Sequence, residues 1–302
     1  MYYIDGLTQK QIAATLGLSR MGVSRLLQRA RDEGVVRVEI KYDGYFHEME
    51  ERLASAFPGV QAIVTSGLDG SETQRITAAA SSAANILGRR LSASTTVAVG
   101  WGTTLSATAG RLSSPRSGAR FAPMIGGQGF VALDVHATQI ANVMATRTGG
   151  TACQLLAPAS MRSVREHTAF VANPGIARVL ETAAAADIAI FSVGAPFAPG
   201  ATLQQSGYFA EEDIDLLRRE HAESDIVSLC YLDSRGRSVA EQLAARTISI
   251  TKDDLLKIPY KIIVAVGEEK VTAIRLALRA GFADVFTTDS ITAGALLADG
   301  DS

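Results

Sequence analysis

The chain has 302 residues, of which 47% are hydrophobic and 20% are charged, and its 27 glycines and 8 prolines are spread along its length. This length exceeds a usual single domain of roughly 100–200 residues, and the composition excludes a disordered or collagen-like chain, so we expect two folded units. The formal net charge of −2 argues against a protein that coats nucleic acid through its overall charge. No stretch approaches the about 18 consecutive apolar residues of a membrane span, and the chain does not open on a targeting segment, so we predict no membrane partner.

The charge is unevenly distributed. Residues 1–42 hold seven lysines and arginines against four acidic residues, a net charge of +3, which leaves −5 for the other 260 residues. Such asymmetry indicates a small basic module joined to an acidic body. Cys153 and Cys230 lie far apart in apolar runs, without a Cys or His at metal-ligand spacing. We therefore expect buried thiols in a reducing cytoplasm, with no disulfide and no metal site.

The first forty residues carry the signals of two short helices joined by a tight turn. Thr8 and Gln11 have the spacing of a capping box, Gly17 can end the first helix, and Ser19 is an N-cap for a second helix that ends near Gly34. The match to a helix-turn-helix assigns residues 1–42 to a DNA-binding domain. The expected apolar faces are Ile12, Ala13 and Leu16 on the first helix and Val23, Leu26, Leu27 and Ala30 on the second.

The second helix of such a motif lies in the major groove, where arginine, glutamine and serine can bind base edges. The alternative is a helical hairpin whose arginines are merely solvated. We favour DNA reading because the capping box, turn glycine, second N-cap and exposed basic positions all agree in order. Arg29, Arg31 and Lys10 suit phosphate contacts better than base contacts. The predicted DNA-binding residues are Thr8, Ser19, Arg20, Met21, Ser24, Arg25, Gln28 and Arg29.

Beyond the basic module, residues 35–42 alternate like a short strand, and a helical stretch from Tyr45 to Phe57 assigns 43–59 to a linker helix. From residue 60 onward, apolar strand-like runs alternate with helical stretches. Many runs are continuously apolar, which indicates a parallel sheet covered by helices on both faces, in an α/β domain over 60–302. The expected strands are 60–65, 95–100, 121–127, 151–158, 187–194, 225–233, 261–267 and 283–289, and the expected helices are 73–91, from 103 onward, 137–148, 174–184, 211–220 and 270–279.

The run VAVGWGTTL, residues 97–105, is a candidate ligand site. A buried strand runs through two glycines and two threonines into a helix, so main-chain amides, hydroxyls and a helix dipole converge as in an anion site. The run has no P-loop lysine, so we do not expect a nucleoside triphosphate. From the residues alone, a plain strand-to-helix turn without a ligand is an equal alternative.

The chain resembles the SorC/DeoR-type family of bacterial sugar-binding transcriptional regulators over nearly its whole length. The motifs are the run at 2–40, then VAVGWGTTL, MIGGQG, LLAPA, FSVG, LDSRG, VGEEKVTAIRLALRAG and VFTTD. The resemblance implies a Rossmann-like α/β effector domain, similar to the sugar-phosphate isomerase and CoA-transferase superfamily. It also implies a homodimer or homotetramer, palindromic double-stranded operator DNA, and control of a carbohydrate operon by a sugar, sugar alcohol or sugar phosphate, without a cofactor.

The resemblance also implies effector contacts at the start of the helix after VAVG, at the Gly-Gly turn with a polar position shortly after it, and at a ligand-anchoring lysine, matched by Lys270. His136 is the nearest match to the polar position, and Asp233 falls where a strand-end carboxylate could hold a sugar hydroxyl. For these two, surface or turn roles are equal alternatives. The predicted effector-binding residues are Gly102, Thr103, Thr104, Leu105, Gly126, Gly127, His136, Asp233 and Lys270.

The sequence departs from the family pattern at two places. Members that bind sugar bisphosphates carry arginine before the Gly-Gly turn, where this chain has Ile125. We therefore expect a monophosphate or an uncharged polyol. The family's helix before the helix-turn-helix has little room ahead of Thr8, so we expect either a start upstream of Met1 or a less stable unit.

Two rival functions stand beside gene regulation. An isomerase-like enzyme would need a base such as Asp134, His136, Asp233 or Lys270. The sequence has no Ser-His-Asp or HExxH signature, so we predict no catalysis. A protein-interaction module would predict no effect of small molecules on DNA affinity.

Overall fold

The computed structural model describes residues 1–2, 7–32, 45–67, 70–114, 117–127, 135–205 and 209–298. The chain divides into two compact units, Met1–Tyr42 and Asp43–Ser302. The strand expected at 35–42 and the candidate base Asp134 fall outside the described residues. In the part of the chain that is described, no helix is both long and apolar enough to span a bilayer.

The first unit consists of α1 (Gln9–Leu16) and α2 (Arg20–Asp32), and the local signals of the sequence explain where each begins. The Gln11 amide donates to Thr8 Oγ1 at 3.3 Å, and the Thr8 amide donates to Gln11 Oε1 at 2.9 Å, which confirms the capping box. Gly17 ends α1 in the left-handed region, with φ 65°. Ser19 Oγ accepts from the Gly22 amide at 3.0 Å and caps α2.

The apolar core of this unit is smaller than the sequence predicts. Ile12, Ala13 and Val23 are buried, and Leu7 and Leu27 pack against them. The expectation that Leu16 and Leu26 belong to the buried faces is wrong, because each is 53% exposed. Because two short helices share only a narrow contact, the apolar side chains that flank this contact stay exposed to solvent.

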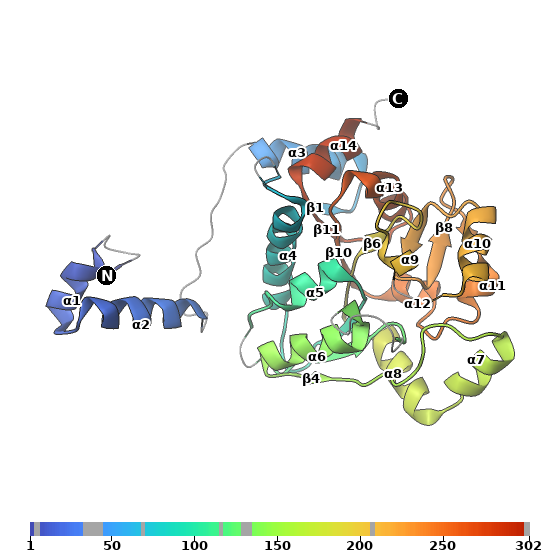
Figure 1. Cartoon of the computed structure of the whole chain (residues 1–302), viewed down its shortest axis with the longest axis horizontal. Helices are drawn as coiled ribbons and strands as arrows, with labels where there is room; N and C mark the ends of the chain where they lie inside the picture. The colour runs from blue at the N-terminus through green and yellow to red at the C-terminus, as the bar shows by residue number, and fades with distance from the viewer. Residues whose placement is uncertain are drawn as a thin grey trace. The chain divides into compact units, whose positions relative to one another are not determined.

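A seven-stranded sheet forms the centre of the second unit (Figure 1). Its strands are β1 (Gln61–Thr65), β2 (Thr96–Val99), β3 (Arg120–Pro123), β4 (Thr151–Ala152), β5 (Ile188–Phe191), β10 (Tyr260–Val264) and β11 (Val285–Asp289). The order is β1-β11-β10-β5-β2-β3-β4, and every neighbouring pair is parallel. The predicted parallel sheet is confirmed.

Helices cover both faces of this sheet, which explains why its strands are apolar at consecutive positions. Val97 and Val99 pack with α4 (Glu72–Gly88), α5 (Thr103–Ala109) and α6 (Ala137–Thr148). Ala98, between them, faces the other layer, which contains α3, α8, α13 and α14. The bounds of this second set are Tyr45–Ala56, Pro174–Ala184, Val271–Arg279 and Ser290–Ala298.

Helix α3, expected as a connection between domains, lies within the second unit and packs on β1 and α14. Glu50 Oε1 on α3 accepts a hydrogen bond from the Val64 amide of β1 at 2.8 Å. Helix α3 is thus fixed to one edge of the sheet.

A small antiparallel sheet in the order β6-β7-β8-β9 corrects two predicted strands. The run 187–194 splits between β5 and β6, and the run 225–233 is a hairpin of β7 and β8. Val227 and Ser228 turn it with φ 55° and 59°, and Asp225 Oδ1 accepts from the Ser228 amide at 2.5 Å. The strands are β6 (Val193–Gly194), β7 (Ser224–Ile226), β8 (Cys230–Leu232) and β9 (Ser238–Val239).

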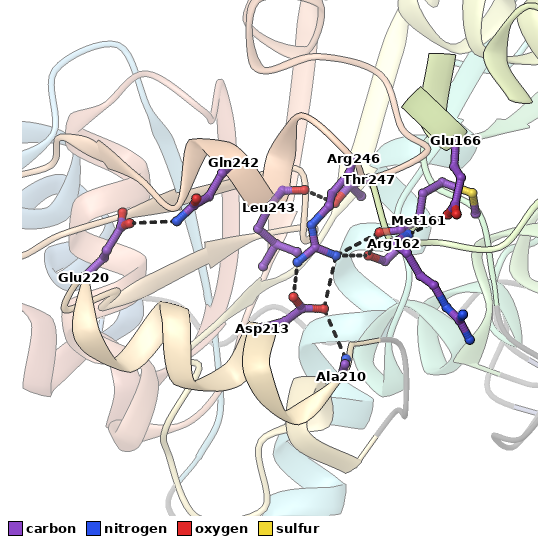
Figure 2. A network of polar contacts seen from close by, with 11 residues as sticks. Met161, Arg162, Glu166, Ala210, Asp213, Glu220, Gln242, Leu243, Arg246 and Thr247 are labelled. Carbon is purple, nitrogen blue, oxygen red and sulfur yellow. Dashed lines mark hydrogen bonds and ion pairs between the residues drawn. The ribbon is translucent and has the colours of Figure 1, made fainter. Parts of the chain in front are cut away.

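A buried ion pair and the hydrogen bonds of its arginine join three segments of the second unit (Figure 2). Asp213 on α10 is 4% exposed and contacts the guanidinium of Arg246, just after α11. Arg246 Nη1 also donates to the Met161 carbonyl at 2.8 Å and to Ser160 Oγ at 3.2 Å. The short helices of the second unit not yet named are α7 (Val164–Val171), α9 (Thr202–Gln205), α10 (Glu211–Arg219), α11 (Glu241–Ala244), α12 (Lys252–Lys257) and the 3-10 helix η2 (Glu268–Lys270).

The two cysteines are unpaired thiols. Cys230 is buried, as expected, whereas Cys153 is only half-buried. Burial raises the pKa of both thiols. Across the described residues, no cluster of three His, Cys, Asp or Glu side chains is placed to hold a metal ion.

Candidate ligand pocket and DNA-reading helix

A pocket of about 220 Å³ lies where β2, β5 and β10 end, at the carboxyl edge of the parallel sheet. Ligands of open α/β sheets bind at this edge. The start of α4 and the small sheet complete the walls. The lining residues are Glu72, Ile76, Trp101, Gly102, Thr103, Thr104, Ser192, Val193, Gly194, Ala195, Pro196, Ala198, Pro199, Gly200, Ala201, Leu203, Asp225, Val227, Glu269 and Lys270.

The loop after β2 brings the start of α5 to this pocket. A side chain at Gly100 would place a Cβ 2.8 Å from the Cβ of Phe191, so only glycine fits there. Gly102 has φ 111°, a conformation that favours glycine, and its amide donates to the Val135 carbonyl at 2.9 Å. Helix α5 has no side-chain cap, so no side chain satisfies the first amides of the helix, and Thr103 and Thr104 there line the pocket.

Three of the four residues predicted at the start of α5 line the pocket. They are Gly102, Thr103 and Thr104. The fourth, Leu105, is fully buried in the core cluster beneath α4, α5 and α6, so its side chain is committed to packing.

Lys270 also lines the pocket, where the chain leaves β10 and enters α13. Its Nζ donates to the Val266 carbonyl at 3.2 Å and lies 3.8 Å from Glu269 Oε1. Gly267 holds this turn with φ 130°, and its amide donates to Thr292 Oγ1 at 2.9 Å. The predicted lysine therefore approaches the same space as α5 from a different strand.

Asp225 is a buried carboxylate of the pocket that the sequence does not reveal. It lines the wall made by the small sheet and is 4% exposed. Burial raises its pKa from 3.8 to about 7, although hydrogen bonds from the Ser228 amide and hydroxyl oppose this rise. A carboxyl group that titrates near neutrality inside a pocket is typical of functional sites.

The Gly-Gly turn, His136 and Asp233 do not line the pocket. The Gly127 amide donates to the Ala157 carbonyl at 2.9 Å, and the imidazole of His136 packs on Gly127, where a Cβ would lie 3.0 Å from its Nδ1. The carboxylate of Asp233 is used within the β8–β9 turn, where it accepts from Arg237 Nε at 2.8 Å. The structure thus gives Gly126, Gly127, His136 and Asp233 partners within the fold.

The outer surface of α2 carries the predicted reading groups. Arg20, Met21, Ser24, Arg25, Gln28 and Arg29 are all exposed, whereas Val23 on the opposite side is buried. Thr8 and Ser19 are exposed too, but their hydroxyls serve the helix caps. Of the predicted DNA-binding residues, the exposed side chains that do not serve a helix cap are therefore those on α2.

Comparison with known proteins gives a consistent assignment. The family described as "Putative sugar-binding domain" matches residues 45–298, and the family "Sigma-70, region 4" matches residues 1–33. The sorbitol operon regulator of Klebsiella pneumoniae is 29% identical over 98% of this chain and 95% of its own length. The transcriptional regulator LsrR of Escherichia coli (strain SMS-3-5 / SECEC) is 32% identical over 98% and 92%.

Solved structures agree with these relatives. The full-length sorbitol operon regulator SorC from Klebsiella pneumoniae superposes with a TM-score of 0.81 at 27% identity, over 98% of this chain and 95% of that one. A DeoR family transcriptional regulator from Listeria monocytogenes gives a TM-score of 0.75 at 27% identity, over 83% and 98%. These relatives are regulators of transcription and not enzymes, which favours regulation over the isomerase alternative. The chain belongs to the SorC/DeoR-type family of sugar-binding transcriptional regulators.

Proposed function

We propose that this regulator acts in the cytoplasm on a palindromic operator of a carbohydrate operon. In this proposal, a sugar, sugar alcohol or sugar monophosphate in the pocket changes the affinity of α2 for DNA. The observation that carries the proposal is the pocket itself. It joins the uncapped start of α5, Lys270 and the buried Asp225 at the carboxyl edge of the sheet.

The pocket suggests a role for each group. Thr103, Thr104 and Lys270 suit a phosphate or a terminal hydroxyl, because amides, hydroxyls and an ammonium group all donate hydrogen bonds. Asp225 suits sugar hydroxyls, which it can meet as a donor or as an acceptor. Ile125 is fully buried, so the position before the Gly-Gly turn offers no cation for a second phosphate.

The dimeric or tetrameric state is part of the proposal. A helix-turn-helix dimer reads two half-sites one DNA turn apart, so a ligand can alter affinity by changing the spacing of two α2 helices. The support is that α2 is an exposed basic helix on a small unit of its own.

The first test concerns the effector. An operator is selected from random DNA, and its affinity is measured with pentitols, hexitols, hexoses and their monophosphates. We expect one chemical class to shift operator affinity, and we expect Lys270→Met to weaken that ligand about 10-fold or more, because a hydrogen bond from a charged group is lost. Lys257→Met changes an exposed lysine outside the pocket and should respond like the wild type. Unchanged operator affinity across the whole panel would argue against the proposal.

The second test concerns DNA reading. Arg25 is exposed on the first half of α2, and Arg25→Ala should weaken operator binding by about 1–3 kcal/mol if its guanidinium binds a base. Lys10→Ala, at a phosphate-type position, should weaken operator and random DNA equally. Equal losses on both DNAs for Arg25→Ala would move this arginine to the phosphate-contact class.

A further inference from the structure

A second cavity lies apart from the sugar pocket, between the edge strand β9, helices α11 and α12, and His167 of α7. Its volume is about 330 Å³, within the range of small-molecule sites, roughly 300–1,000 Å³. It shares no lining residue with the first pocket. Neither DNA reading nor sugar binding accounts for it.

One end of this cavity carries a positive charge. Lys252 Nζ donates to Ser238 Oγ at 2.8 Å, and Ser238 is its one hydrogen-bond partner within the described ranges. Further N–H groups of the ammonium can therefore bind a ligand. The Ser238 hydroxyl lies 3.8 Å from the thiol of Cys230.

Three charged groups act on that thiol. Burial and the Ser238 hydroxyl have the largest effects on the pKa of Cys230, in opposite directions. Of the charged groups, Lys252 then has the largest effect and lowers this pKa, whereas Asp225 and Glu241 raise it less. Glu241 is solvent-exposed, so its field is screened. The ammonium group of Lys252 is therefore the strongest single charge acting at this end of the cavity.

Apart from the exposed carboxylate of Glu241, the other walls are apolar or neutral. Leu229 and Ile250 are 4% and 3% exposed, and Val239 joins them along the cavity. Burial lowers the pKa of His167 from 6.5, against a hydrogen bond to the main chain of Thr247, so its imidazole is mainly neutral at pH 7. The cavity therefore combines one cation with an aliphatic surface.

We propose that this cavity is a second small-molecule site, which binds a small aliphatic monocarboxylic acid. The carboxylate contacts Lys252 and Ser238, and the chain packs on Leu229, Val239 and Ile250. One ammonium group balances one carboxylate, whereas a phosphate dianion would keep an excess charge. A sugar would place hydroxyls against the aliphatic wall without partners, which costs free energy.

The test is calorimetric titration of the full-length protein with sodium hexanoate, with 1-hexanol as the uncharged probe of equal chain length. We expect hexanoate to bind more tightly than hexanol. Lys252→Met should weaken hexanoate about 10-fold or more, because a charge-assisted hydrogen bond is lost. Lys257→Met, an exposed lysine at the end of the same helix, should leave hexanoate affinity unchanged.

A second variant approaches the cavity from its apolar side. Val239→Phe fills part of the volume while Lys252 stays in place, and it should also weaken hexanoate. Failure of hexanoate to bind the wild type, or equal affinity in Lys252→Met, overturns the proposal. Loss of hexanoate binding in Lys270→Met alone would place the acid in the sugar pocket and would overturn the proposal too.

Discussion

Asp225→Asn is expected to stabilise the second unit at pH 7 and to weaken the sugar effector about 10-fold or more. Asparagine keeps an oxygen acceptor for the Ser228 amide but carries no charge into the fully buried site. An effector in this pocket loses its contact with the one buried carboxyl group among the described residues of the lining. Most substitutions of a buried, hydrogen-bonded residue lower the free energy of unfolding. An increase for Asp225→Asn would therefore point to the removal of a buried charge.

The pH dependence follows from the direction of the shift. The pKa of Asp225 rises from 3.8 to about 7 on folding, so between these values the folded state binds more protons than the unfolded chain. The free energy of unfolding therefore decreases as the pH rises from about 4 to 7, by on the order of 4 kcal/mol at most. The gain of Asp225→Asn over the wild type should be full at pH 7 and should shrink towards pH 4.

Urea unfolding followed by the fluorescence of Trp101, the single tryptophan of the chain, measures this difference in the second unit. Asp233→Asn is the control, from the same sequence run. Arg237 lowers the pKa of Asp233, so this carboxylate stabilises the fold at neutral pH and its removal should destabilise. A stability difference for Asp225→Asn that does not change with pH, or an undiminished effector response, would contradict the assignment.

Arg246→Ala is expected to lower the free energy of unfolding of the second unit by about 3–5 kcal/mol, the usual cost of leaving one member of a buried ion pair alone. The side chains of Arg246 and Asp213 are 19% and 6% exposed. The substitution also removes the donors to Ser160 and Met161, which hold the segment before α7 (Figure 2). Urea unfolding followed by Trp101 fluorescence is again the measurement.

The same helix offers a matched control. Arg218 and Asp215 form an ion pair on α10 with side chains 61% and 55% exposed, and exposed pairs contribute about 0–1 kcal/mol. Arg218→Ala should therefore change stability little, although its guanidinium also lies 5.3 Å from the ring centroid of Phe197. Similar losses for the two arginine variants would mean that burial does not set the strength of the Asp213 pair.

Features encoded by neighbouring residues could be predicted from the sequence. Thr8 with Gln11, Gly17 and Ser19 act within one or two helical turns, so their spacing alone locates the ends of α1 and α2. The parallel sheet could also be predicted from the sequence, because strands buried on both faces need continuous apolar runs. The start of α5 was found because a strand, glycines and a helix follow one another directly.

Features that depend on distant contacts could not be predicted. The run 225–233 has two aspartates, and an uninterrupted strand would make Asp233 its functional end. The left-handed Val227 and Ser228 instead fold it into a hairpin, which puts Asp225 in the pocket and Asp233 in a turn. Valine and serine rarely adopt this conformation, so composition gives no warning of the turn.

The bond between Glu50 and Val64 also bears on how copies of this chain can associate. β1 is an edge strand, and an open edge offers its amides as a template on which another strand can add. The Val64 amide already donates a hydrogen bond to Glu50 Oε1. Strand β4, at the opposite edge of the sheet, has only two residues. Edge-to-edge extension of the sheet between copies of this chain, a common route to aggregation, is therefore disfavoured at both edges.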